Sequence, residues 1–435
     1  MLKNFRNIII GIILISSWKS LALNSSSYLI ANEAIKLLDF EVAYNHFKNT
    51  TNLKTETNLH NQLLTYVHLK KILDAHAVAE EILKINKKNE EAWIVILTYA
   101  KINNNMNEFK RYQEEKNETE MALLNYIFYE DKNKIKNNMV SARSIMEVVQ
   151  GTISDSKESA NYNFLLFYLS LSTMLDPNYN EGYYISAQIY EKLKKLNKAK
   201  DLYEQVSNMH SLYLDSQINI ALIKNNQGLF NEGEKILQEL LDKFAQNEKI
   251  IIALADLNRL AKKYKRAIDY YSNVLSSQNN SIRDYSRVFY MRGICYERIK
   301  NWKSAEKDFF NSLELNPESA DVLNYLAYGW LERDENLDIA INMLKKAYNK
   351  NPDSHHILDS LAWAYYKNNQ LTKASNLMEK VIVMAPGEAI SLDHLGDIYF
   401  AMKRKREANF FWKQALDLAD PKNKIKKNLL KKLNL

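Results

Sequence analysis

The sequence contains little glycine, proline or cysteine. Among 435 residues there are 9 glycines, 5 prolines and a single cysteine, Cys295. Scarce glycine and proline disfavour a fold built from short strands and tight turns, and they favour long helices. One cysteine excludes an intramolecular disulfide. The composition therefore predicts an all-α protein in which Cys295 serves as a small buried apolar residue.

A strong charge of one sign is also absent. The formal net charge is +7, and Lys3, Arg6 and Lys19 near the N-terminus contribute to it. Acidic and basic residues are interspersed along the chain until the Lys-rich C-terminal tail. A surface that binds nucleic acid normally gathers Lys and Arg on one face. We therefore expect no nucleic-acid partner.

The N-terminus has the pattern of an export signal. Two basic residues, Lys3 and Arg6, precede the apolar run IIIGIILISSW, and a small-x-small site follows at Ser20-Leu21-Ala22. This pattern predicts a signal peptide over residues 1–22, which is cleaved after Ala22. The alternative is a retained membrane anchor, but the apolar run is about half of the ~20 residues that a spanning helix needs.

The C-terminal half repeats with a fixed period. Four prolines, Pro317, Pro352, Pro386 and Pro421, follow one another at 34 or 35 residues. Small residues recur at nearly the same interval, as Ala199, Gly233, Ala267, Ala305, Ala340, Ala374 and Ala408. Two residue classes in one register indicate an array of helix-pair units of about 34 residues.

The most regular unit, residues 391–421, resembles the tetratricopeptide repeat (TPR). It matches the repeat at Leu392, Leu395, Gly396, Tyr399, Ala408, Trp412, Ala415 and Pro421. Small residues are needed where two antiparallel helices cross, and proline cannot continue the second helix. The resemblance implies an all-α fold, a right-handed α-α superhelix of stacked helix pairs known as a TPR solenoid.

The same register divides the chain into parts. We expect a signal peptide at 1–22, N-terminal TPR units at 27–104, irregular helices or degenerate repeats at 105–177, seven consecutive TPR units at 178–421, and a basic capping helix at 422–435. The last of these places Ile425, Leu429 and Leu433 on one apolar face, as the end piece of a solenoid requires.

Motifs of catalysis and metal binding are missing from the sequence. It contains no G-x-x-x-x-G-K-[ST], G-x-G-x-x-G, G-x-S-x-G, C-x-x-C or H-E-x-x-H. The one histidine pair, His355 and His356, would point about 100° apart on a helix and would not readily hold one metal ion. We expect no enzyme activity, no cofactor and no metal site.

In TPR arrays the first helices of successive units line a concave groove. The resemblance therefore implies a partner-binding groove made of Tyr290, Asp321, Asn324, Tyr328, His356, Asp359, Trp363, Tyr366, Asp393, Asp397 and Phe400. Carboxylates and aromatic faces both attract cations, and the rings also bury apolar area. We expect a protein or peptide partner of basic and apolar character. The alternative is that the rings only pack against neighbouring helices.

The groove assignment also carries an expectation about stability. If Asp359, Asp393 and Asp397 serve binding, replacing all three with Lys abolishes partner capture and leaves the helical melt nearly unchanged. A free C-terminal carboxylate is disfavoured as the ligand, because aspartates occupy positions where basic residues or Asn would be needed.

Two stretches, 322–400 and 27–47, look like exported TPR-array proteins of the alphaproteobacterial cell envelope. This resemblance implies a periplasmic or outer-membrane-associated location. The resulting hypothesis is a non-enzymatic interaction scaffold or adaptor of the bacterial cell envelope. The alternative is a regulatory or targeting subunit of an envelope peptidase or glycosyltransferase complex. The Lys-rich C-terminal tail adds a candidate for peripheral contact with the envelope membrane.

Overall fold

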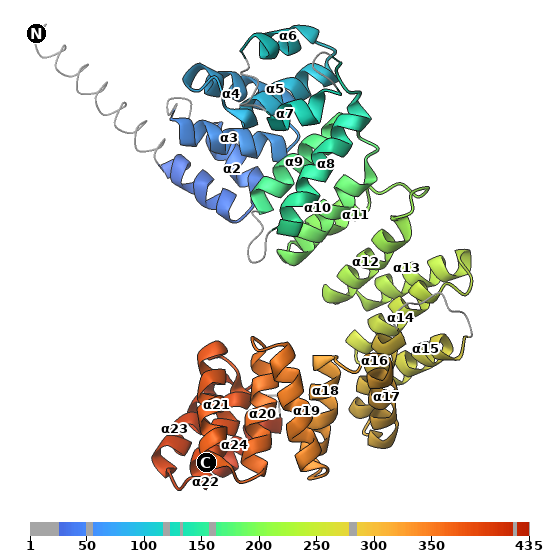
Figure 1. Cartoon of the computed structure of the whole chain (residues 1–435), viewed down its shortest axis with the longest axis vertical. Coiled ribbons are helices and arrows are strands. Elements are labelled where there is room, and N and C mark those ends of the chain that lie inside the picture. Colours follow the sequence, from blue (N-terminus) through green and yellow to red (C-terminus); the bar gives the residue numbers. More distant parts are fainter. Residues whose placement is uncertain are drawn as a thin grey trace, which may run out of the picture. The chain divides into compact units, whose positions relative to one another are not determined.

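The computed structural model describes residues 26–48, 55–115, 122–130, 134–155, 162–277, 285–420 and 424–434 (Figure 1). These residues form helices, turns and loops, with one isolated antiparallel bridge between Tyr129 and Ile135. Within these ranges, no helix combines the length and the apolar character that crossing a membrane requires. The predicted signal peptide, 1–22, lies outside the described residues.

The chain divides into two compact units, Met1–Ile223 and Lys224–Leu435. In the first unit, residues 26–36 are helical. They are followed by α2 (Phe40–Phe47), α3 (Glu56–His68), α4 (Ile72–Ile85), α5 (Glu90–Ile102), α6 (Met106–Glu115), α7 (Ala122–Phe128), α8 (Asn138–Asp155), α9 (Tyr162–Leu175), α10 (Asn180–Lys192) and α11 (Leu196–Tyr203). The boundary between the units falls within α12 (Tyr213–Asn226).

The second unit continues the series of helices. It contains α13 (Phe230–Lys243), α14 (Glu248–Leu260), α15 (Tyr264–Ser276), α16 (Tyr285–Arg298), α17 (Trp302–Leu315), α18 (Ala320–Leu331), α19 (Leu337–Lys350), α20 (His355–Lys367), α21 (Leu371–Met384), α22 (Ala389–Ala401), α23 (Lys405–Leu418) and α24 (Lys424–Lys432). Helices α14 to α23 form five consecutive pairs, and each pair packs against the next (Figure 1). The predicted fold class, an all-α TPR solenoid of stacked helix pairs, is confirmed.

The turn inside a pair depends on a residue with a left-handed backbone. Lys70 and Lys300 have φ angles of 55° and 65°, and Lys194, Lys262, Asn369 and Lys403 occupy the same place in other pairs. The residue after each one closes the helix end, as when the N–H of Asn301 donates to the carbonyl of Tyr296 at 2.9 Å. Glycine is usual at such an end, and a residue with a Cβ costs about 1 kcal/mol there. Packing of the second helix against the first must offset this cost.

Small residues let the helices of a pair approach closely. A Cβ added at Gly293 on α16 would lie 2.7 Å from Cε1 of Phe309 on α17, and one added at Gly396 on α22 would lie 2.4 Å from Cδ1 of Trp412 on α23. Ala408 is fully buried at the same crossing. The expectation that small side chains occupy the crossings is confirmed at these positions, and the rings of Phe309 and Trp412 fill the space beside the glycines.

The first unit departs from simple stacking. Helix α9, in the region 105–177 that loses the repeat pattern, packs against α8 and α10 and also returns to α3 and α5. Its residues are buried on nearly all sides, as Leu165, Leu169 and Leu171 show. This return brings the end of α3 close to α10, although more than a hundred residues separate them in the sequence.

Candidate functional site

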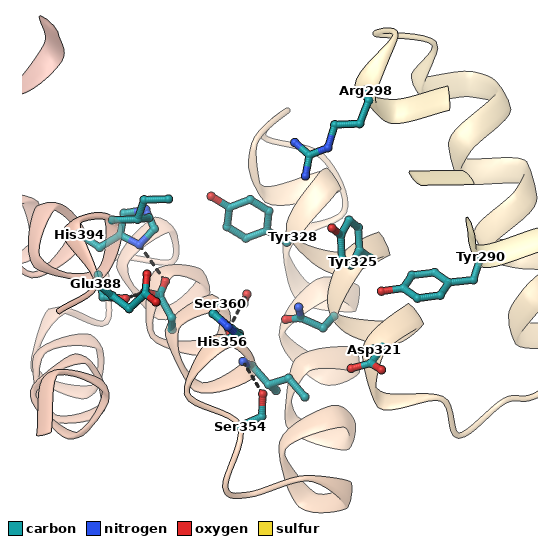
Figure 2. A pocket seen from close by; sticks show the side chains of 15 residues that line it. Tyr290, Arg298, Asp321, Tyr325, Tyr328, Ser354, His356, Ser360, Glu388 and His394 are labelled. Atoms are coloured by element: carbon teal, nitrogen blue, oxygen red, sulfur yellow. Dashed lines mark hydrogen bonds and ion pairs between the residues drawn. The ribbon is translucent and has the colours of Figure 1, made fainter. Parts of the chain in front are cut away.

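A cavity of about 490 Å³ lies in the second unit, between the first helices of four consecutive pairs (Figure 2). We call it the C-terminal pocket. Helices α16, α18, α20 and α22 supply its walls and rim, so each pair contributes residues from the same face. The lining residues are Tyr290, Arg298, Asp321, Asn324, Tyr325, Tyr328, Ser354, His356, Ile357, Asp359, Ser360, Glu388, Ile390, Ser391 and His394.

A buried ionic pair forms the floor at one end of the C-terminal pocket. Asp359 on α20 accepts a hydrogen bond from Nδ1 of His394 at 2.8 Å and another from the Ser391 hydroxyl. Both Asp359 and His394 are buried. The imidazole of His394 also stacks on Trp363, with ring centroids 4.1 Å apart. Asp359 therefore joins two neighbouring helix pairs as well as facing the pocket.

The environment of His394 favours its charged form. Burial lowers the pKa of His394, but the charge of Asp359 and the hydrogen bond to it outweigh burial, so the pKa is raised above its usual value. The charge of Asp359 is thereby offset inside the protein. It is not available to a ligand as a free negative charge.

Three other polar groups of the C-terminal pocket, on Asp321, Glu388 and Asn324, have no partner among the described residues. Asp321 and Glu388 are exposed, and neither forms an ion pair with any residue in the described ranges. The side-chain oxygen Oδ1 of Asn324 is buried and accepts no hydrogen bond from the described residues. Figure 2 shows Glu388 on the His394 side of the pocket and Asp321 on the Tyr290 side. The only Arg in the lining, Arg298, lies 3.5 Å from Glu297 and is paired with it.

Tyrosine rings form the wall opposite His394 (Figure 2). The rings of Tyr290 and Tyr325 meet edge to face at 5.5 Å. Burial is the largest cause that raises the pKa of Tyr290 and of Tyr328, so both phenols stay neutral at physiological pH. A neutral phenol donates and accepts hydrogen bonds, and its ring offers an apolar face to a ligand.

The structure divides the residues of the predicted groove into two sets. Six of them line the C-terminal pocket: Tyr290, Asp321, Asn324, Tyr328, His356 and Asp359. Five do not: Trp363, Tyr366, Asp393, Asp397 and Phe400. The binding role of both sets stays a prediction.

Two of the outlying residues belong to an aromatic stack beneath the pocket. Trp363 lies between His394 and Tyr366, with its ring centroid 4.6 Å from that of Tyr366. Its indole N–H donates to Glu332 at 3.3 Å. Phe400 lies further along α22 on Trp412, at 5.4 Å between ring centroids, and is 52% exposed. The packing alternative describes Trp363 better than ligand contact does.

The two outlying aspartates are held by the C-terminal helix. Lys432 on α24 donates to Asp393 at 2.6 Å and to Asp397 at 2.8 Å. Burial and the nearby Asp397 raise the pKa of Asp393 despite this bond, while the two carboxylates raise the pKa of Lys432 against the effect of burial. Asp397 also accepts the indole N–H of Trp412 at 3.1 Å.

These contacts correct the expectation about stability. Asp359, Asp393 and Asp397 each hold one helix to another, through His394 or through Lys432. Replacing them with Lys would remove a buried interaction and two partly buried ones and would place like charges together. We therefore expect the triple substitution to lower the melting temperature, and Asp321 and Glu388 are better positions to test binding.

Sequence reasoning missed several lining residues. Three of them directly follow a predicted groove residue, namely Tyr325 after Asn324, Ser360 after Asp359, and His394 after Asp393. Consecutive residues on a helix point about 100° apart, so the pocket lies slightly to one side of the predicted face. All three residues occupy the same position of their repeat units, and this shared position was a signal in the sequence that could have identified them.

One group of potential metal ligands occurs among the described residues. His76, Glu80 and Glu108 offer ligand atoms within 4.8 Å of one another. The guanidinium of Arg111 already binds Glu80 at 2.7 Å and Glu108 at 3.3 Å. This charge occupies the place of a cation, and we assign no metal to the group.

Comparison with known proteins identifies one of the repeat units. Residues 181–209 match the family model of the tetratricopeptide repeat. The TPR family is thereby supported. A TPR repeat-containing protein of Pseudomonas aeruginosa is 28% identical over 110 residues, which are 25% of this chain and 18% of that protein. One of Methanocaldococcus jannaschii is 25% identical over 168 residues, 36% of this chain and 29% of the relative. The matches thus cover less than a third of either relative.

Solved TPR structures are similar to the chain in part. A tetratricopeptide repeat protein from Parabacteroides merdae covers 59% of this chain with 99% of its own length, at a TM-score of 0.45 and 21% identity. A chain of the Cut9–Hcn1 complex covers 94% of this chain with 83% of its own length, at a TM-score of 0.49 and 14% identity. TPR proteins in general bind protein or peptide partners and are not catalytic.

Proposed function

We propose that this chain is a non-enzymatic interaction scaffold that binds a basic segment of a partner protein in the C-terminal pocket. The observation that carries the proposal is the set of unsatisfied polar groups there. Asp321 and Glu388 have no ion pair with the described residues, and Asn324 Oδ1 has no donor. Two carboxylates and one acceptor call for a ligand that supplies positive charge and N–H groups.

A peptide with Lys or Arg has both. Its cationic side chain can pair with Asp321 or Glu388, and a backbone N–H can donate to Asn324. The aliphatic stem of the same side chain can lie on the rings of Tyr290 and Tyr328. Exposed ion pairs contribute little by themselves, about 0–1 kcal/mol each. The partly enclosed walls and the apolar contact must supply the rest of the affinity.

The binding test uses charge reversal on the rim of the pocket. The double variant Asp321→Lys/Glu388→Lys should lose capture of a fluorescein-labelled Lys-rich peptide in fluorescence anisotropy. A matched control, Asp269→Lys/Glu314→Lys, makes the same charge change at exposed residues of α15 and α17 and should bind normally. Equal binding by the two double variants would contradict the proposal, provided that circular dichroism shows both to be folded.

We also propose that the scaffold acts in the bacterial cell envelope, in the periplasm or at the outer membrane. The leader-like pattern of residues 1–22 supports this location. Cell fractionation followed by N-terminal sequencing tests it: the proposal expects an envelope fraction and a mature chain that begins at Leu23. A full-length chain in the cytoplasmic fraction would contradict the proposal.

Helix α24 supplies a candidate for membrane contact in that location. Lys432 is engaged with Asp393 and Asp397, but Lys427 and Lys431 are exposed. If these two lysines touch anionic lipid, Lys427→Glu/Lys431→Glu should abolish flotation with anionic liposomes. Flotation of the variant at the wild-type level would exclude the contact. This design leaves Lys432 in place, which deletion of residues 422–435 would not.

A further inference from the structure

A second cavity, of about 240 Å³, lies in the first unit, and we call it the N-terminal pocket. It forms where α9 brings the ends of α2 and α3 against α10 and α11. It is lined by Phe40, Glu41, His68, Leu69, Lys70, Leu166, Ser170, Thr173, Tyr183, Ser186, Tyr190, Lys198, Asp201 and Leu202. Its walls do not come from the first helices of successive repeats, so it is a different kind of site from the C-terminal pocket.

Two amino groups face the N-terminal pocket without a carboxylate partner. Lys70 Nζ lies 3.5 Å from the hydroxyl of Tyr183 and 4.6 Å from the centroid of its ring. Lys198 Nζ lies over Tyr190 and Phe40, at 5.8 Å and 5.9 Å from the ring centroids. Neither lysine forms an ion pair with the residues that the structure describes. Burial lowers the pKa of both, so an incoming anion would stabilise their charged forms.

The two acidic residues of the lining do not act as counter-ions for Lys70 and Lys198. Asp201 is exposed and pairs with Lys200 at 3.0 Å. Glu41 is also exposed. At Lys198, burial and the charge of Lys195 lower the pKa and outweigh the charges of Asp39 and Glu41, which raise it. The positive charge of Lys70 and Lys198 is therefore left without a close counter-ion in the part of the chain that is described.

A histidine adds an acceptor to the same pocket. Nδ1 of His68 is 2.8 Å from the carbonyl oxygen of Leu64, which can only accept, so Nδ1 carries the proton. Burial lowers the pKa of His68 to about 3, which keeps the ring neutral. Nε2 must then be an acceptor. It is buried and receives no hydrogen bond from any described residue.

We propose that the N-terminal pocket binds an acidic residue of a peptide. The carboxylate is received by Lys70 and Lys198, and a backbone N–H beside it donates to Nε2 of His68. The volume lies below the roughly 300–1,000 Å³ of typical small-molecule sites, which suits one side chain and its backbone. Apolar walls at Phe40, Leu166 and Tyr190 take the methylene groups. A bare inorganic anion would offer no N–H donor and would leave these walls uncovered.

The test uses the full chain and two labelled peptides, Leu-Glu-Leu and Leu-Gln-Leu with blocked ends, in fluorescence anisotropy. The Glu peptide should bind at least about tenfold more tightly than the Gln peptide, because a charge-assisted contact is the difference between them. Its binding should weaken with added salt. Equal affinity for the two peptides would overturn the proposal. So would displacement of the Glu peptide by an equal concentration of inorganic phosphate.

Variants assign the effect to the pocket. Lys198→Met should weaken binding of the Glu peptide about tenfold and keep the stem that lies on the rings. The control Lys192→Met removes a charge from an exposed residue of α10 and should bind as the wild type does. His68→Phe keeps the ring beside Phe40 but removes the acceptor, and should weaken both peptides equally. If Lys198→Met and Lys192→Met bind alike, the site is wrong. Asp321→Lys/Glu388→Lys should leave this binding intact, so failure here is distinct from failure of the C-terminal pocket.

Discussion

Asp359 and His394 form a buried pair, with 2.8 Å between the carboxylate oxygen and Nδ1, that joins helix α20 to helix α22. The pair lies under the C-terminal pocket and above the Trp363 ring. A contact of this kind contributes to the stacking of consecutive repeats, since a solenoid has only nearest-neighbour interfaces. It also ties the shape of the pocket to the charge of one histidine.

The first prediction concerns pH. The folded-state pKa of His394 is raised, so its contribution to stability is complete below the unfolded value of about 6.5 and is lost as pH rises through the folded value. The melting temperature should therefore fall as pH rises above about 6.5. Thermal melts of the wild type and His394→Asn measure this: the variant should show a smaller fall, and the part that remains comes from His60, whose pKa is raised by its hydrogen bond to Glu91. His356→Asn, at an exposed histidine of the same pocket, should retain the full fall.

The second prediction concerns the buried carboxylate itself. Asp359→Lys removes the acceptor of His394 and Ser391 and should lower the free energy of unfolding by about 3–5 kcal/mol, the cost of breaking a buried pair. Asp321→Lys, at an exposed carboxylate of the neighbouring pair, should change it by less than about 0.5 kcal/mol. Urea unfolding followed by tryptophan fluorescence compares the two variants. Similar midpoints would mean that Asp359 has no structural role.

The third prediction concerns close packing between two neighbouring helix pairs, where α18 meets α17. Gly329→Ala would place Cβ 2.1 Å from the Trp302 ring, on which the Arg333 guanidinium stacks at 4.0 Å. The ring cannot move freely, and overpacking should cost about 1–3 kcal/mol. Gly151→Ala in α8 meets no atom within 4 Å and should stabilise its helix by about 0.5–1 kcal/mol. Opposite shifts in melting temperature are expected, and two shifts of the same sign would contradict this account.

The fourth prediction uses the single cysteine. Cys295 is fully buried in α16, and burial raises the pKa of its thiol to about 12. The thiolate is the reactive form, so the folded protein should react with an aromatic disulfide reagent far more slowly than the urea-unfolded chain. Absorbance of the released thiolate measures both rates. Rapid and complete labelling of the native protein would show that α16 opens readily or is not packed as described.

Part of the candidate site follows from repeat positions alone. Tyr290, Asn324 and Asp359 line the C-terminal pocket, and helix periodicity together with the repeat period places them on one face of successive first helices. Trp363 and Asp397 share that periodicity and yet face other groups. These two side chains are held by residues outside their own repeat position: Glu332 accepts the indole N–H of Trp363, and Lys432 binds Asp397. Periodicity predicts the direction in which a side chain points, but it does not predict which group the side chain meets there.

The sequence by itself determined the repeated helix pairs of the second unit. Helix period, small residues at the crossings and proline at the ends are signals within one unit, and contacts within a unit are local in the chain. Only the tertiary structure decided the N-terminal pocket, where Lys70 meets Tyr183 across 113 residues. That contact depends on α9 packing against α3, in a region without a repeat register. A contact between distant segments leaves no periodic pattern in the sequence, because its partners are matched by shape and charge after each segment has folded.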